Sequence, residues 1–402
     1  MSRSRLSDSS SSSSAMTDQS PARSLLWSLS LIAMLLAACG APGVSSPTGS
    51  ASSDEITVTD LAGRKVRLKA PVLRMILGEG RQLYIIAMLD RDNPFQRIVG
   101  WRDDLIKNDL DSYNKYKAKF PQAADVPILG DPSSGELSVE KAIALKPDVL
   151  LLNLDAYQGA QDAGVIDNLS KAGIPTVIID YREAPLENTV PSTLLLGKIM
   201  GREAVAKKFV DFYQRQVSTV ESRIAAIKTP SPSVFLYRAP GFADCCSTFG
   251  KGNLGLIAER AGGDNIAAPL LPGWEGVLNP EQVIASDPDD IIVTGSNWSS
   301  SLPAGTFVPL GYSTSAASAE ASLNQLMRRS NWTSLSAYQD KRVYAIWHQF
   351  YNSPYQFIVL DVFAKWFYPD KFQDIDPVQI FSRFHQEFLP IDFSGTFWIE
   401  LQ

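Results

Sequence analysis

The sequence predicts an α/β protein of two lobes separated by a long helical segment. Short apolar strands alternate with short helices in both halves of the chain, a pattern typical of parallel sheets covered by helices. Residues 189–227 between them keep a helical period of apolar side chains. The chain has 402 residues, which is too long for one typical hydrophobic core, so two lobes are expected.

The first lobe is predicted to open with a β-hairpin at 54–68. Ile56 and Val58 alternate with polar residues ahead of a Leu-Ala-Gly-Arg turn. Ser138 can cap a short helix that Pro147 ends, and an apolar run suited to a buried parallel strand follows. Further strands are expected at 73–77, 97–100, 149–152 and 176–180, and helices at 81–89, 138–145 and 166–172.

The helical segment after the first lobe is expected to run for some 35 residues, with an interruption near Gly201. Thr229-Pro-Ser-Pro232 ends it, and the alternation of strands and helices then resumes. In the second lobe, strands are predicted at 234–237, 290–294 and 342–346, and helices at 254–261, 279–285, 353–367 and 380–388.

A local repeat links the two lobes. Glu140 leads into Lys146-Pro-Asp-Val-Leu-Leu-Leu152, and Glu281 leads into Asp287-Pro-Asp-Asp-Ile-Ile-Val293. In both copies, a glutamate on a short helix precedes a Pro-Asp turn and a buried strand. The repeat predicts that the two lobes are structurally equivalent.

The N-terminal segment has the layout of a secretion signal. An apolar run follows Arg23 and ends in Leu36-Ala-Ala-Cys39, and it is shorter than the roughly 20 apolar residues of a spanning helix. Its end resembles a bacterial lipobox, in which the cysteine is lipidated; the alternative is an ordinary signal peptide that contains a cysteine. We interpret residues 1–38 as the signal, with residues 1–15 as a tail ahead of a start at Met16, and the Gly/Ser/Pro-rich residues 39–53 as a flexible tether.

Composition excludes several function classes. The net charge is −6 and no basic run interrupts the acidic balance, so no nucleic-acid partner is expected. Besides Cys39, the only cysteines are the adjacent Cys245 and Cys246, which could form a disulfide or stay as buried thiols. With two histidines, His348 and His385, a site for a free transition metal is not expected. We interpret His385 as a residue on a helix surface.

An enzyme is not expected either. Gly250-Lys-Gly-Asn-Leu-Gly255 matches G-x-G-x-x-G, but the dinucleotide motif needs a strand immediately before it, and the predicted strand at 234–237 lies a dozen residues earlier. The chain contains no G-x-S-x-G turn and no phosphate-binding P-loop.

Three segments carry a resemblance to a known family: Ser138-Val-Glu140, Gly262-Gly-Asp-Asn265 and Asn279-Pro-Glu281. With the hairpin and the lipobox, they make the chain resemble the periplasmic binding proteins of ABC importers for ferric siderophores, haem and vitamin B12. The resemblance implies two Rossmann-like lobes, one long linking helix and a ligand cleft between the lobes. The lobes would then be residues 54–188 and 229–402, with the linking helix at 189–228.

The resemblance also implies a function and partners. The chain would be an extracytoplasmic lipoprotein that captures a ferric siderophore and delivers it to a permease dimer, as a monomer tethered to a membrane. Cobalamin, haem and a non-transport surface lipoprotein are the alternatives. No cofactor is expected, since iron would enter only within the bound chelate. Glu140 and Glu281 match the family's permease-docking glutamates; without docking they would be solvated glutamates favoured by the helix dipole.

The ligand cleft is expected where loops follow the carboxyl ends of the strands. Arginine forks there could grip carboxylate or catecholate oxygens, and aromatic faces could stack on planar groups. The candidate ligand-binding residues are Arg81, Tyr84, Trp101, Arg102, Tyr237, Arg238, Trp274, Trp298, His348 and Tyr351.

Overall fold

The computed structural model describes residues 54–242 and 245–402. They belong to one compact unit, Ser52–Gln402. The predicted signal peptide, the lipidation site at Cys39 and the tether lie outside the described residues. Within the described ranges, no helix is both long enough and apolar enough to cross a membrane.

The first lobe is built on a four-stranded parallel sheet, in the order β4-β3-β5-β6. A hairpin precedes it. The Asp60 carboxylate stabilises the hairpin turn, because it accepts hydrogen bonds from the Ala62 and Arg64 amides and forms an ion pair with the Arg64 side chain. The strands are β1 (Asp54–Thr59), β2 (Lys65–Ala70), β3 (Met75–Leu77), β4 (Ile98–Trp101), β5 (Val149–Asn153) and β6 (Thr176–Ile179).

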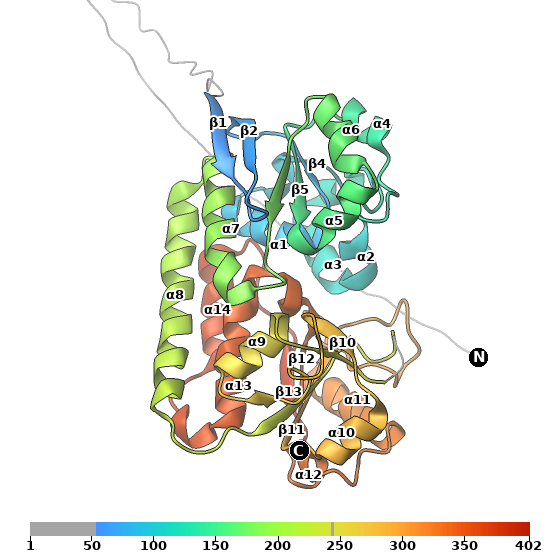
Figure 1. Cartoon of the computed structure of the whole chain (residues 1–402), viewed down its shortest axis with the longest axis vertical. Coiled ribbons are helices and arrows are strands. Elements are labelled where there is room, and N and C mark those ends of the chain that lie inside the picture. Colours follow the sequence, from blue (N-terminus) through green and yellow to red (C-terminus); the bar gives the residue numbers. More distant parts are fainter. Residues whose placement is uncertain (1–53, 243–244) are drawn as a thin grey trace, which may run out of the picture. The chain divides into compact units, whose positions relative to one another are not determined.

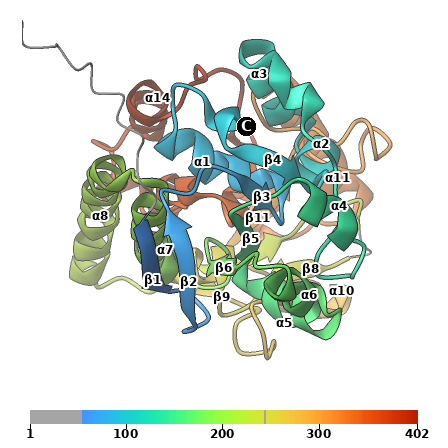
Figure 2. The same cartoon turned by 90° about the horizontal axis from the view of Figure 1, so that it is seen from above.

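Helices cover the first sheet on both faces (Figure 2). They are α1 (Leu83–Leu89), α2 (Asp104–Asn108), α3 (Leu110–Lys119), α4 (Val139–Ala144), α5 (Leu154–Asp162) and α6 (Val165–Lys171), with short 3-10 turns η1 (Gly80–Gln82), η2 (Pro94–Gln96) and η3 (Pro121–Asp125). The predicted strands and helices of this lobe are all found, and α2, α3 and α5 are additional.

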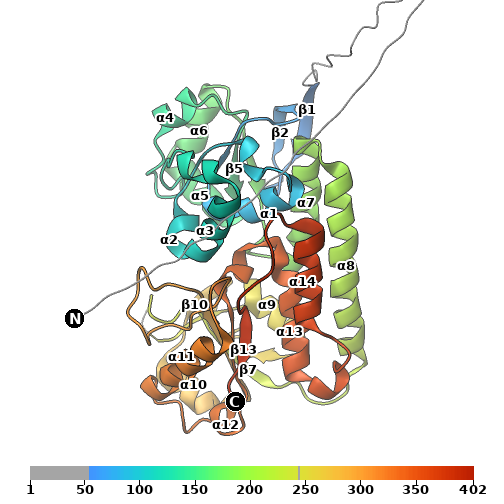
Figure 3. The same cartoon turned by 180° about the vertical axis from the view of Figure 1, so that it is seen from behind.

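The predicted helical segment is two helices, α7 (Pro185–Met200) and α8 (Glu203–Ala226). Gly201 ends α7 in the left-handed conformation, with φ of 64°, and the chain reverses there. The predicted interruption near Gly201 is therefore found, but residues 189–228 are not one linking helix: α7 packs beside α8, and α8 alone is the long helix that runs along both lobes (Figures 1 and 3).

The second lobe repeats the parallel design. Its sheet has the order β13-β12-β11-β7-β9, with β13 as an antiparallel edge strand. The small sheet of β8 and β10 stands apart from it. The strands are β7 (Ser233–Tyr237), β8 (Ser247–Phe249), β9 (Asp264–Asn265), β10 (Glu275–Val277), β11 (Asp290–Gly295), β12 (Val343–Trp347) and β13 (Trp398–Glu400).

The helices of the second lobe also bury α8. All but one residue of α13 is buried, and it packs on α8, while Phe384 and Phe388 of α14 contact Phe212 of α8. The helices are α9 (Asn253–Arg260), α10 (Pro280–Ser286), α11 (Ala316–Arg329), α12 (Ser336–Gln339), α13 (Phe357–Phe367) and α14 (Pro377–Phe388), with 3-10 turns η4 (His348–Asn352), η5 (Pro354–Gln356) and η6 (Pro369–Lys371). The two-lobe α/β prediction is confirmed.

Candidate functional site

A cavity of about 160 Å³ lies where the two lobes meet. Its walls come from loops that follow parallel strands: Arg81 after β3, Arg238 after β7, Trp298 after β11 and His348 after β12. Carboxyl ends of strands are where open α/β sheets place their ligands. The complete lining is Arg81, Asn108, Arg238, Ala239, Phe242, Trp298, His348 and Tyr351.

Arg81 connects the two lobes across this cavity. Its Nε donates to Asp104 at 2.6 Å within the first lobe. Its Nη1 donates to Gln349 Oε1 at 3.1 Å and to the Tyr351 hydroxyl at 2.6 Å on the second lobe. The Tyr351 ring centroid lies 5.4 Å from the Arg81 guanidinium and 5.0 Å from that of Arg182, so one aromatic ring contacts two cations.

The Glu79 carboxylate lies between the two arginines, Arg81 and Arg182, and forms ion pairs with both. Both of its carboxylate oxygens accept from Arg182, at 2.9 and 2.8 Å, and Asn352 of the second lobe donates to it at 2.8 Å. Burial alone would raise the pKa of Glu79, but the charges of Arg182 and Arg81 and the Asn352 donor lower it to about 2. Glu79 is therefore ionised at neutral pH.

Arg238 is the cavity arginine with spare donor capacity. It pairs with Glu275 at 2.8 Å, and its Nη1 donates to Ser247 Oγ at 3.3 Å. Its Nε is buried and has no hydrogen-bond partner within the part of the chain that the structure describes. A buried donor without a partner is costly, so this nitrogen is a candidate contact for an acceptor atom of a ligand.

His348 reports the electrostatic character of the cavity. Its Nδ1 lies 2.9 Å from Thr294 Oγ1, and its ring packs against the Tyr351 ring in a tilted arrangement, with 4.5 Å between the centroids. Burial lowers the pKa of His348 well below its usual value, and the positive charges of Arg238, Arg81 and Arg182 lower it further. The histidine is therefore neutral at pH 7, in a field that disfavours cations.

A second group of contacts joins the lobes at the cavity's edge. The Asp111 carboxylate on α3 accepts from Asn297 Nδ2 at 2.9 Å and from the Ser313 amide and hydroxyl at 3.0 and 2.6 Å. Trp298 Nε1 donates to the Asn108 carbonyl at 3.1 Å. These contacts make α2 and α3 a latch against the second lobe; we call Asp111, Asn297 and Ser313 the Asp111 latch.

The structure places half of the candidate ligand residues at the cavity: Arg81, Arg238, Trp298, His348 and Tyr351. Tyr84 and Trp101 are buried in the core, where Tyr84 donates to Asp109 at 2.6 Å and Trp101 packs against Phe95. The other three lie elsewhere: Arg102 pairs with Asp131, Tyr237 is buried against Trp332, and Trp274 is half-buried beside β10.

Three lining residues were not anticipated: Asn108, Ala239 and Phe242. Ala239 and Phe242 lie in the same loop after β7 as Arg238, so the rule that selected Arg238 could have selected them. Asn108 ends α2, a helix whose five residues carry too short a pattern to be recognised.

Two expectations about other motifs need correction. His385 is buried, with its Nε2 2.9 Å from the Tyr312 hydroxyl, and is not on a helix surface. A strand, β8, does precede Gly250 directly, but it pairs antiparallel with β10 outside the parallel sheet.

Cys245 and Cys246 are joined in a disulfide. Among the described residues, no group of His, Cys, Asp and Glu could hold a metal ion.

The two predicted docking glutamates are both exposed. Glu140 lies in the first turn of α4 and Glu281 in the first turn of α10, on different lobes. Within the described ranges, neither carboxylate has an ion pair.

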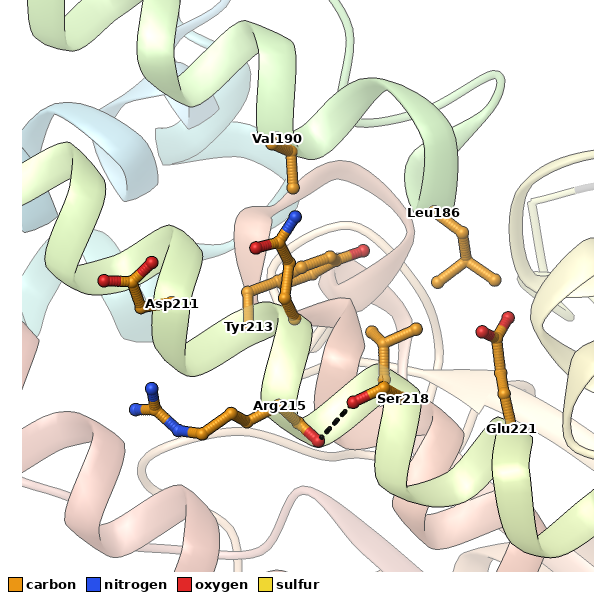
Figure 4. Close-up of a pocket in the computed structure, with 9 residues that line it drawn as sticks. Leu186, Val190, Asp211, Tyr213, Arg215, Ser218 and Glu221 are labelled. Carbon is orange, nitrogen blue, oxygen red and sulfur yellow. Dashed lines mark hydrogen bonds between the residues drawn. The ribbon is translucent and has the colours of Figure 1, made fainter.

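A larger hollow of about 560 Å³ lies between α7 and α8, away from the cleft (Figure 4). Its acidic residues are already paired: Asp211 with Lys207 and Glu221 with Arg260. The Ser218 hydroxyl, drawn in Figure 4, donates to the Arg215 carbonyl. Since both acidic side chains are already in ion pairs, size alone does not make this hollow the site.

Comparisons with known proteins agree with this architecture. Residues 99–349 match the family described as periplasmic binding protein. The molybdate-binding protein MolA of Haemophilus influenzae is 26% identical over 86% of this chain and 93% of its own, and the uncharacterized ABC transporter substrate-binding lipoprotein YvrC of Bacillus subtilis is 23% identical over 68% and 81%.

Solved structures give the same result. The TroA-like periplasmic binding protein FepB from Veillonella parvula is 29% identical, has a TM-score of 0.79 and covers 86% of this chain and 100% of its own. MolA bound to molybdate has a TM-score of 0.63 at 19% identity, covering 85% and 99%. The second match supports the fold alone.

Proposed function

The chain belongs to the periplasmic binding protein family, the substrate-binding components of ABC importers, and we propose that its substrate is a compact oxyanion of the molybdate class, held in the cavity between the lobes. The ligand would enter between Arg81 of the first lobe and Arg238, His348 and Tyr351 of the second. Its capture would then stabilise the contacts that already join the two lobes.

The observation that carries this proposal is the size and charge of the cavity. A volume of about 160 Å³ is below the roughly 300–1,000 Å³ of pockets for drug-sized ligands. Arg81 and Arg238 line it, and their charges and that of Arg182 add to burial in lowering the pKa of His348; Arg238 Nε offers a buried donor. A small anion matches both features, and a molybdate-binding relative aligned over 86% of the chain adds support.

A ferric siderophore is the second candidate. The Phe242 ring is half exposed and lies edge to face with Trp298 at 5.0 Å, so aromatic surface extends outward from the arginines. Such a surface suits a planar chelate. This ligand would require the lobes to separate further, because its volume exceeds that of the cavity.

Delivery and anchoring complete the proposal. We place Glu140 and Glu281 in the docking contact with a permease dimer, where opposite charge would set orientation and association rate more than affinity. Lipid attached at Cys39 would tether the protein on the outer side of a membrane. Reversing both charges, Glu140→Lys with Glu281→Lys, should abolish uptake and leave ligand affinity unchanged; normal uptake by the double variant would refute the docking roles.

Ligand titration tests the substrate class. Residues 52–402 are titrated by calorimetry with molybdate, tungstate, sulfate and phosphate, and with a ferric catecholate chelate, haemin and cobalamin. We expect submicromolar molybdate or tungstate binding, weakened at least tenfold in Arg238→Gln. Arg102→Gln is the matched control, because Arg102 pairs with Asp131 and does not line the cavity. Binding of the chelate alone would favour the second candidate, and no binding by a folded protein would overturn both.

A further inference from the structure

The docking helices α4 and α10 each expose an isoleucine beside the docking glutamate. Ile143 is 38% exposed and Ile284 is 49% exposed, which is unusual for large apolar side chains in this chain. Each stands three residues after its glutamate, Glu140 or Glu281, and side chains at i and i+3 share one face of a helix. The same pair of side chains, one acidic and one apolar, thus occurs once on each lobe.

We propose that Ile143 and Ile284 are the apolar halves of two equivalent docking pads, each pad being a glutamate and the isoleucine three residues later. The partner is the membrane permease of the proposed function, on which this inference rests. Each of its two contact sites should carry a basic side chain next to an apolar pocket. The glutamate would steer the encounter, and the isoleucine would hold the complex by burying apolar surface.

Both pads are fixed to their lobes by the same device. A residue just after each helix has a positive φ: Lys146, which follows the C-cap of α4, at 47°, and Asp287, the C-cap of α10, at 37°. Two residues later an aspartate accepts from the backbone where the lobe's first parallel strand begins: Asp148 from Leu73 and Arg74, and Asp289 from Ser233. Each pad therefore moves as a rigid part of its lobe.

The charge and placement of the pads identify the kind of partner. Both glutamates are acidic groups without an ion pair among the described residues, so a basic partner surface complements them. The helices α4 and α10 lie on different lobes, on the side of the body away from α8 (Figures 1 and 3). A partner that engages both pads must present two similar sites, as a dimer does.

The pad on the second lobe has more apolar surroundings. Ile284 and Pro280 also line a hollow of about 710 Å³, together with Phe242, Leu326 and Trp332. A partner side chain can enter there beside Ile284. We therefore expect Ile284 to contribute more to the complex than Ile143.

The test measures binding of the whole mature protein to the permease–ATPase complex in lipid nanodiscs. Ile143→Ala should raise the dissociation rate about fivefold and Ile284→Ala about tenfold, and the double variant about fiftyfold, because the two sites are distant and their effects multiply. Association rate, its salt dependence and molybdate affinity should not change. Val378→Ala is the matched control, since Val378 on α14 is 50% exposed and lies outside both pads.

Glutamine at Glu140 and Glu281 separates this inference from the proposed function. Those variants should slow association at low salt. Suppose that the glutamine variants weaken docking but the alanine variants dissociate as slowly as Val378→Ala. The proposed role of the two isoleucines would then be wrong, and the docking role of the two glutamates would remain. If the glutamine variants leave docking unchanged, the proposed docking roles fail. Self-association of the free protein that Ile143→Ala or Ile284→Ala removes would overturn the inference by assigning the pads to a second copy.

Discussion

Replacing Glu79 by glutamine should destabilise the folded protein, because this carboxylate is the shared acceptor of a buried network. It accepts from Arg182 at 2.8 Å and from Asn352 at 2.8 Å, with Arg81 at 3.7 Å. Its pKa is lowered from 4.5 to about 2. That difference corresponds to about 3 kcal/mol of preference for the ionised form in the folded state.

The net loss should be smaller than this figure. Burial raises the pKa of Asp104 and Asp155, and the Glu79 charge raises both further. Removing the Glu79 charge lets those two carboxylates ionise more easily beside Arg81 and Arg182. We therefore expect Glu79→Gln to lower the free energy of unfolding by about 2 kcal/mol at pH 7.

The stability contributed by the Glu79 carboxylate should depend on pH. The pKa of Glu79 is lower in the folded than in the unfolded chain, so its contribution is fully present above pH 4.5 and is lost as the pH falls toward 2. The difference between wild type and Glu79→Gln should therefore narrow below pH 4.5. Urea unfolding of residues 52–402, followed by tryptophan fluorescence, measures this difference.

Glu183→Gln is the matched control, because the pKa of Glu183 is raised in the folded protein whereas that of Glu79 is lowered. Burial and the charges of Asp180 and Asp155 raise the pKa of Glu183, so a neutral side chain should cost nothing there. If Glu79→Gln unfolds within about 0.5 kcal/mol of wild type, or loses no more stability than Glu183→Gln, the assignment of Glu79 as the organising charge is incorrect.

Three further measurements follow from the same structure. Burial raises the pKa of Asp361 to about 8, so Asp361→Asn should increase the free energy of unfolding at pH 7 by at most about 4 kcal/mol. This gain should shrink toward pH 4, and an unchanged free energy of unfolding at pH 7 would contradict the prediction. Asp111→Asn should weaken ligand binding about tenfold through faster dissociation, since it disrupts acceptors for Asn297 and Ser313; equal dissociation rates would exclude the latch. Ligand affinity should stay constant from pH 6 to 8, because His348 remains neutral there; tighter binding at pH 6 would show that it gains a proton.

Periodicity predicted most of the fold because each lobe alternates elements with distinct patterns. The buried run 149–152 is β5, and the hairpin at 54–68 has the predicted pairing of β1 with β2. The helices that were missed, such as α2 and α5, are short or polar, so their apolar stripe is too weak to recognise. Tertiary packing rather than local pattern defines them.

The break at Gly201 shows a second limit. The sequence has no proline there, and a glycine inside a helical pattern is compatible with either a continuous helix or a C-terminal cap. What decides is packing: a Cβ on Gly197 would lie 2.5 Å from the Ala206 side chain, so α7 and α8 approach closely enough to form a hairpin. Such a contact between helices cannot be read from the periodicity of either one.

The sequence allowed the location of the candidate site to be predicted, but not the contacts that its side chains make. The rule that ligands bind beyond the carboxyl ends of strands located Arg81, Arg238, Trp298 and His348. The same rule also selected Trp101, which faces the core, because strand ends give no information on the direction of a side chain. The role of Glu79 was hidden for another reason: its partner Arg182 is 103 residues away.

The contacts between the lobes explain how ligand capture and docking can be linked. The polar contacts at and around the cavity include Arg81 with Tyr351, Glu79 with Asn352 and the Asp111 latch. Each such bond adds on the order of 1 kcal/mol, so together they contribute a few kcal/mol to holding the lobes in this arrangement, an amount that binding of the proposed ligand would be able to match. The pads at Glu140 and Glu281 lie outside this network and are rigid within their lobes. In the proposed transport cycle, closure of the lobes would change the relative orientation of the pads, and a permease that holds both pads would distinguish loaded from empty protein.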